Sequence, residues 1–339
     1  MFRRLTNADT HSGDPAMNHP VPDGEGLPSY ARLISHRGAP LRRAWLNLVF
    51  RLAVKRSFTM DADIGQLRAM QARMDKRLAR PDPAMRRTPV TCNGVTAEWI
   101  DLPESRPDRV IFYLHGGAWM FRFPLIHGTM VARWCHRLGA RALMVDYRLA
   151  PEHPYPAGPD DCLAAYAWLL AQGVNARNVV IAGDSAGGNL TLATLHRLKA
   201  AGLPLPACAV ALSPLVDFTL SSRSLIINQQ RDPMFTLAAC QALRPYYLRP
   251  EQMLNHDASP LFGDFTGMPP VFLQASNTEM LRDEVLRVAE RIHGQGGVVE
   301  LELWQDMPHV FQAMSKLPQS GAALDSIVRF VERHAGWKN

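Results

Sequence analysis

The residues with the clearest chemical meaning lie at 183–188, where the sequence reads Gly-Asp-Ser-Ala-Gly-Gly. A mostly apolar run at 178–182 precedes them and a helical pattern at 189–195 follows them. A serine on a sharp turn between a strand and a helix is typical of a nucleophile elbow, G-x-S-x-G, whose strained turn exposes the hydroxyl. We therefore predict that Ser185 is a nucleophile. The competing interpretation is a glycine-rich turn in which Ser185 only caps the helix.

A serine hydroxyl is a poor nucleophile near neutral pH and needs a base, which a third group must orient. With this type of elbow, the acid and then the histidine follow the serine along the chain. His309 fits the base because it follows the alternating run 299–304 and the turn 306–308. The alternative is an exposed loop histidine. The other histidines after Ser185 lie in a helix, in a polar loop or near helix ends: His196, His256, His293 and His334.

The orienting acid is expected just beyond the strand predicted at 270–276. Glu279 is the first acidic residue past that strand, Asp283 lies one helical turn further on, and Glu284 follows it. Acidic residues in a first helical turn also stabilise the helix dipole, which would explain Asp283 and Glu284 without catalysis. We favour Glu279 as the acid and keep Asp283 as the alternative.

A glycine loop follows the buried strand predicted at 109–114 and reads His-Gly-Gly-Ala-Trp at 115–119. Glycines let backbone N–H groups approach a substrate oxygen, and the residue after the nucleophile adds one more donor. The predicted oxyanion hole therefore consists of Gly116, Gly117 and Ala186, the alternative being a tight turn alone. His115 precedes Ser185, the wrong order for the base, so we expect it to stabilise the loop.

Four motifs taken together resemble the hormone-sensitive-lipase-like family of α/β-hydrolases, also called bacterial family IV esterases. The resemblance covers roughly residues 45–335 and rests on HGGAW at 115–119, DYRLAPEHPYPA at 146–157, GDSAGG at 183–188 and MPHVF at 307–311. It implies a serine carboxylesterase or lipase without metal or cofactor. Matched position by position, it implies Ser185 as nucleophile, His309 as base, and Gly116, Gly117 and Ala186 as oxyanion donors. The chain departs from the family pattern at Ala118, in the HGGG loop, and at Glu279, where many members carry an Asp-Pro-Leu segment.

Composition limits the other functions. The 339 residues carry a formal charge of +6, much of it in the first 90 residues, but no nucleic-acid-reading motif. A solvated helix face explains this charge, and weak contact with a lipid surface is the functional alternative. No apolar run reaches the length of a membrane-spanning helix, and no secretion signal opens the chain. Five dispersed cysteines, without a C-x-x-C pair, favour reduced thiols and a cytoplasmic location.

The alternation of strands and helices predicts an α/β-hydrolase fold, with a mostly parallel central sheet, helices on both faces and a helical cap. Residues 1–30 are expected to be disordered, 31–88 to form an N-terminal helical cap segment, and 89–339 to form the catalytic domain. Within that domain, 216–262 are predicted to be a second cap segment. Its Met234, Phe235 and Tyr246 are candidate pocket walls, although helix packing explains them equally well.

These residues favour hydrolysis of small or medium apolar carboxylic esters through an acyl-enzyme. Two alternatives stay open. The same triad would serve a lactone or amide hydrolase, and the fold would also suit a non-catalytic ligand receptor. A small ester is the expected partner, nucleic acid is not, and a homodimer is kept open.

Overall fold

The computed structural model describes residues 26–36, 38–56 and 63–338. The disorder predicted for 1–30 therefore falls almost entirely outside the described residues, and residues 26–30 lead directly into the first strand. Within the described ranges, no helix is long and apolar enough to cross a membrane.

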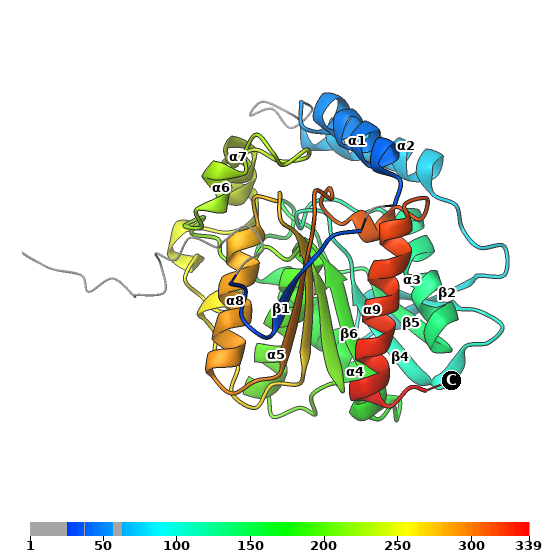
Figure 1. The fold of residues 1–339 in the computed structure, drawn as a ribbon. Helices are drawn as coiled ribbons and strands as arrows, with labels where there is room; N and C mark the ends of the chain where they lie inside the picture. Colours follow the sequence, from blue (N-terminus) through cyan, green and yellow to red (C-terminus); the bar gives the residue numbers. More distant parts are fainter. Residues whose placement is uncertain (1–25, 37, 57–62, 339) are drawn as a thin grey trace, which may run out of the picture.

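The described strands form one nine-stranded sheet in the order β1-β9-β8-β7-β6-β4-β5-β3-β2 (Figure 1). In this spatial order, each strand from β1 through β5 is parallel to the next one. The two strands at the other edge differ, because β3 is antiparallel to both β5 and β2. This confirms the predicted mostly parallel sheet. The strands are β1 (Ala31–Ile34), β2 (Arg86–Cys92), β3 (Val95–Asp101), β4 (Arg106–Leu114), β5 (Ala140–Val145), β6 (Val179–Asp184), β7 (Cys208–Leu212), β8 (Val271–Ser276) and β9 (Val299–Trp304).

Helices cover both faces of the sheet because side chains alternate along each buried strand. In β4, Ile111 and Tyr113 belong to the core under α3 (Pro124–Leu138) and α9 (Pro318–Ala335). Phe112 and Leu114 point to the other face, where α4, α5 and α8 pack. These helices are α4 (Ala157–Ala171), α5 (Ala186–Ala200) and α8 (Arg282–Gly294).

The β2–β3 hairpin turns at Asn93 and Gly94, with φ values of 48° and 86°. Two successive positive φ angles are what a type I′ turn requires, and an Asn-Gly pair adopts them readily. The domain boundary predicted at residue 89 falls inside β2.

The sheet also contains a strand that the sequence analysis placed in the cap segment 31–88. Strand β1 pairs in parallel with β9, so that Leu33 lies opposite Leu303. The correction is that residues 31–34 belong to the sheet. A four-residue edge strand gives too short a pattern to recognise, and its partner lies about 270 residues further along the chain.

Two helical insertions lie at the upper end of the view in Figure 1. The first, between β1 and β2, contains α1 (Pro40–Val49), the π-helix η2 (Phe50–Val54) and α2 (Ile64–Leu78). The second, between β7 and β8, contains α6 (Ser224–Ile227) and α7 (Leu237–Tyr247). Short 3-10 turns complete the fold: η3 (Ala176–Asn178), η4 (Pro250–Gln252), η5 (Pro260–Phe262) and η6 (Phe311–Ala313).

Candidate active site

Ser185 occupies a strained turn between β6 and α5. Its backbone has φ 53° and ψ −119°, and its side chain makes no capping hydrogen bond to the helix. A Cβ on Gly187 would lie 1.9 Å from the Leu114 carbonyl oxygen, and one on Gly183 would lie 2.3 Å from the Gly187 carbonyl oxygen. Glycine is therefore required at both positions, because strand and helix pass so closely. The geometry is that of the predicted elbow and not of a serine helix cap.

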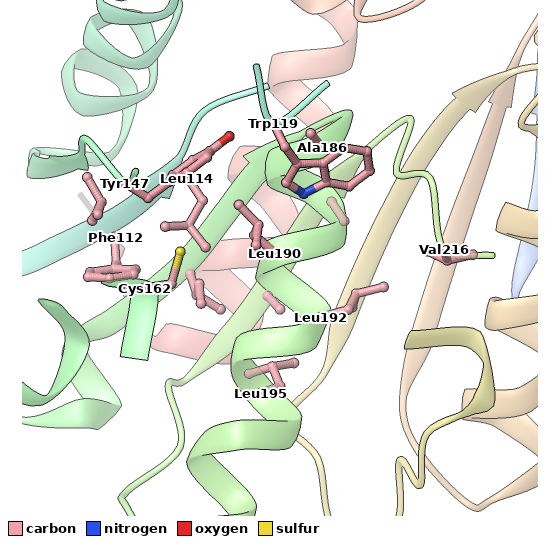
Figure 2. Close-up of a cluster of buried hydrophobic side chains, with 14 of the residues drawn as sticks. Phe112, Leu114, Trp119, Tyr147, Cys162, Ala186, Leu190, Leu192, Leu195 and Val216 are labelled. Atoms are coloured by element: carbon pink, nitrogen blue, oxygen red, sulfur yellow. The ribbon is translucent and has the colours of Figure 1, made fainter. Parts of the chain in front are cut away.

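The elbow stands on a rigid apolar base. Leu190 and Leu195 of α5 are fully buried, and they belong to the same cluster as Phe112 and Leu114 of β4 (Figure 2). Trp119 lies at the upper end of this cluster in the view. Close packing under the turn resists relaxation of the strained backbone, so the position of Ser185 is fixed by the core.

His309 and Glu279 are joined by a hydrogen bond. The His309 Nδ1 lies 2.7 Å from Glu279 Oε2, and both side chains are buried, with Glu279 fully so. The other oxygen of Glu279 accepts hydrogen bonds from the Ser213 hydroxyl at 2.8 Å and the Ser276 N–H at 2.7 Å. Since every carboxylate oxygen has a donor, the acid is held in one orientation toward His309.

Asp283, the alternative acid, points elsewhere. Its Oδ2 accepts the backbone N–H of Ser224 at 2.8 Å, and its Oδ1 accepts the Arg282 Nε at 2.8 Å. Glu284 accepts the N–H groups of Val216 and Asp217. Both residues fasten α8 to the segment after β7, a tertiary role beyond the predicted stabilisation of the helix dipole.

Burial and charge act on His309 in opposite directions. Burial by itself lowers the pKa of His309, but the Glu279 carboxylate overcomes that effect, and the pKa is raised above its ordinary value of 6.5. Asp232 and Asp184, which is next to Ser185 in the chain, also raise the pKa of His309. The ring of Phe235 lies edge-on, with its centroid 4.8 Å from that of His309. Among the described residues, His309 Nε2 has no hydrogen-bond partner, so the base can accept a proton there.

The structure corrects the prediction for Gly116. Its N–H donates to Asp184 Oδ1 at 3.0 Å and is therefore not free for a substrate oxygen. The N–H groups of Gly117, Ala118 and Ala186 have no hydrogen-bond acceptor among the described residues. Ala118 was not among the predicted donors because glycine is the residue type expected there, yet Ala118 has a positive φ of 51°.

Glycine is nevertheless required at both loop positions. A Cβ on Gly116 would lie 2.2 Å from Asp184 Oδ2, and one on Gly117 would lie 2.1 Å from the Phe121 carbonyl oxygen. The glycine pair lets the loop pass close to Asp184 and then turn sharply.

Asp184 anchors this loop, a role that the sequence analysis missed. Besides Gly116, its carboxylate accepts the Tyr113 hydroxyl at 2.7 Å and faces His127 Nε2 at 3.1 Å. Burial would raise the pKa of Asp184, but these neighbours stabilise the anion and lower the pKa to about 2. A permanently charged carboxylate therefore ties the glycine loop to the elbow.

His115 has the structural role that was predicted for it. Its ring stacks on Tyr147 at 4.2 Å, and the Tyr147 hydroxyl donates to the His115 carbonyl at 2.6 Å. Burial lowers the pKa of His115 to about 3, so its ring is neutral at physiological pH. Among the described residues, no cluster of three or more His, Cys, Asp and Glu side chains could hold a metal ion.

Known proteins resemble this chain over most of its length. A family model described as "alpha/beta hydrolase fold" matches residues 111–313. An acetyl-hydrolase of Streptomyces hygroscopicus is 34% identical over 248 residues, covering 73% of this chain and 83% of the relative. An esterase of Acinetobacter venetianus is 34% identical over 256 residues, covering 75% and 84%.

Solved structures agree with the sequence relatives. The crystal structure of an esterase from the bacterial hormone-sensitive lipase family superposes with a TM-score of 0.82 at 34% identity, covering 87% of this chain and 98% of that one. The chain therefore belongs to the α/β-hydrolase family. Within that family it is a hormone-sensitive-lipase-like esterase.

Proposed function

We propose that Ser185, His309 and Glu279 form the catalytic triad of this esterase. The observation that carries the proposal is the buried His309–Glu279 hydrogen bond, which leaves His309 Nε2 as the one ring nitrogen available to a substrate-side group. The strained elbow presents Ser185 on the turn next to Asp184, whose charge acts on His309. Among the described residues His309 Nε2 has no hydrogen-bond partner, so the proposal requires the Ser185 hydroxyl to reach it when substrate is bound.

The reaction has two balanced halves. His309 Nε2 takes the hydroxyl proton of Ser185 as its oxygen attacks the ester carbonyl, and the tetrahedral oxyanion forms. When the C–O bond to the alcohol breaks, His309 returns the proton to the leaving alcohol, and an acyl-Ser185 remains. Water then attacks the acyl carbon, with His309 taking and returning its proton, and the acid leaves.

The oxyanion hole follows from the corrected loop geometry. We assign it to the N–H groups of Gly117, Ala118 and Ala186, for which the described part of the chain offers no acceptor. Ala186 is the first residue of α5, so the positive end of the helix dipole adds to its N–H. Gly116 contributes indirectly, through its bond to Asp184.

Small or medium apolar esters are the proposed substrates. A relative named acetyl-hydrolase makes short acyl chains the first to test. Phe235 beside His309 gives the site an apolar wall next to the base.

The proposed cap consists of the insertion containing α1, η2 and α2 and of the segment 216–262. A lactone or amide hydrolase stays an alternative with the same residues, and a receptor is disfavoured because every triad member is present.

Turnover of aryl acetate and aryl butyrate tests this proposal. Ser185→Ala is expected to lower kcat by about 10⁶-fold, because the triad acts as a unit. Ser221→Ala, a serine in the second insertion, is the matched control and should keep full activity. A fluorophosphonate should label Ser185 and no other serine, and a loss below tenfold in Ser185→Ala would overturn the assignment. A panel of esters, lactones and amides then separates the reaction classes.

The cytoplasmic location and the homodimer also stay predictions. Cell fractionation tests the first of them. Light scattering of the purified protein tests the second.

A further inference from the structure

Helix α1 and the η2 turn that continues it carry a row of exposed apolar side chains. The four members, which are between 50% and 85% exposed, are Leu41, Trp45, Leu48 and Leu52. Successive spacings of four, three and four residues put them on one side of the helix, and we call this row the apolar ridge. Such a stripe normally faces the core of a protein, so its exposure needs an explanation.

The polar side of the same helix faces the protein instead. Its side chains donate to main-chain carbonyls of the body, in the pairs Arg42 to Lys316 (2.6 Å), Asn47 to Asp306 (3.1 Å), Arg51 to Gln230 (2.7 Å) and Lys55 to Gln229 (2.5 Å). Three of the four donors are cationic, and hydrogen bonds from charged donors are the strong ones. These bonds fix the rotation of the helix about its axis, so the ridge cannot turn inward without breaking them.

Helix α2 adds positive charge at the same end of the molecule (Figure 1). Its exposed cations are Arg73, Lys76, Arg77 and the following Arg80. Within the part of the chain that the structure describes, none of the four forms an ion pair, and Arg73 and Arg80 donate only to carbonyls of their own helix or its end. Unpaired cations at the same end of the molecule as an exposed apolar ridge are complementary to a membrane, which is apolar inside and anionic at its surface.

We propose that the apolar ridge and the cations of α2 form one surface that docks on an anionic lipid membrane. The ridge enters the boundary between head groups and acyl chains, while the cations meet lipid phosphates. A second copy of the chain fits this face less well. A two-fold contact through the ridge brings the cations of both α2 helices to the same interface, where like charges repel.

The surface is linked directly to the catalytic site. Asn47 bonds the carbonyl of Asp306, three residues before His309, and Arg51 and Lys55 bond the segment that leads to Phe235. Docking therefore brings the segments that carry His309 and Phe235 close to the membrane. If the proposed ester hydrolysis holds, the substrates of the docked protein are apolar esters dissolved in a lipid bilayer.

Vesicle co-sedimentation tests the docking without turnover, using full-length protein that carries Ser185→Ala. Vesicles of phosphatidylcholine with phosphatidylglycerol are compared with pure phosphatidylcholine, at low and high salt. We expect stronger binding to the anionic vesicles and loss of that excess at high salt. The ridge variant Leu41→Ser/Leu48→Ser/Leu52→Ser should bind at least roughly tenfold more weakly.

Two further variants make the test specific. Leu254→Ser/Val298→Ser removes apolar side chains that are 68% and 51% exposed outside α1 and η2, and it should bind like the parent. Lys76→Gln/Arg77→Gln should weaken binding to anionic vesicles on the order of tenfold and leave binding to phosphatidylcholine unchanged.

Three results would overturn the docking proposal. They are no binding to anionic vesicles, equal losses in the ridge and control variants, or a dimer in light scattering that the ridge variant converts to a monomer. Because Ser185 is absent from the vesicle assay, failure there leaves the proposed reaction intact. Failure of the ester assay likewise leaves the docking proposal intact.

Discussion

The Nδ1 of His309 lies 2.7 Å from Oε2 of Glu279, and neither side chain is open to solvent. The second carboxylate oxygen is held by Ser213 and by the Ser276 N–H. A carboxylate in this position fixes the tautomer of the imidazole and stabilises its cation during the reaction. One methylene more than the aspartate of related sites does not prevent this contact.

Glu279→Gln is expected to lower kcat by roughly 10³–10⁴-fold, because the neutral amide neither stabilises the imidazolium nor fixes the tautomer. Asp283→Asn is the matched control, since Asp283 bonds Ser224 and Arg282 rather than His309. It should change kcat less than tenfold and act on stability instead. Steady-state kinetics with an aryl ester measures both. If Asp283→Asn lost more activity than Glu279→Gln, our choice of the acid would be wrong.

The activity of the protein should fall as the pH drops through the raised pKa of His309. Only the neutral imidazole accepts the proton of Ser185, and Glu279 favours the charged form, so the midpoint of kcat/KM lies above the ordinary 6.5. In Glu279→Gln that attraction is gone, whereas burial still lowers the pKa. The midpoint of the variant should therefore shift to lower pH. An unshifted midpoint would show that another group controls the acidic limb.

The proposed triad could be predicted from the sequence because each residue type had to follow a strand end in a fixed order. Ser185, His309 and Glu279 satisfy that order, and the elbow glycines are explained by backbone contacts. Whether a backbone N–H is free to bind a substrate oxygen cannot be predicted from residue type and order. Gly116 has the expected residue type, but its N–H is bonded to Asp184, and only the packing of two neighbouring strands reveals this.

The same limit explains the other differences. The edge strand β1 depends on a partner at the far end of the chain, and no local pattern records it. Phe235 was a candidate pocket wall that helix packing explained equally well. Its contact with His309 depends on the path of a long insertion. A helix was expected within the predicted cap segment 31–88, but an amphipathic pattern gives no sign that the apolar side of α1 faces outward.

Asp184→Asn tests whether the oxyanion loop depends on its carboxylate anchor. Tyr113 and Gly116 both donate to Oδ1 and His127 faces Oδ2, so an amide removes the negative charge and puts its NH2 group toward one of these two sides. We expect kcat to fall by roughly 10²-fold with little change in KM, because displaced donors weaken oxyanion stabilisation.

Tyr113→Phe is the control for the Asp184 variant. It removes one donor to Asp184 and leaves the carboxylate and its bond to Gly116 in place. It should cost less than tenfold in kcat, although losing a buried hydroxyl lowers the free energy of unfolding by about 1 kcal/mol. Equal losses of kcat in both variants would mean that general destabilisation, and not loop position, explains the effect.

Arg68 anchors helix α2 to two loops near the active site. Its guanidinium donates to the carbonyls of Met120 and Ala150 and pairs with Glu152 at 2.7 Å. Arg68→Ala should lower the free energy of unfolding by roughly 1–2 kcal/mol, since the site is partly exposed and water replaces some of these bonds. It should also make the start of α2 more sensitive to limited proteolysis, because the remaining polar anchor, Asp75 bonded to the N–H groups of Leu125 and Ile126, lies in the last turn of the helix. Arg73→Ala on the same helix, whose guanidinium bonds only the Ala69 carbonyl, should stay within about 0.5 kcal/mol of the parent. Thermal unfolding and timed proteolysis measure the two effects, and similar behaviour of the two variants would contradict the anchoring role of Arg68.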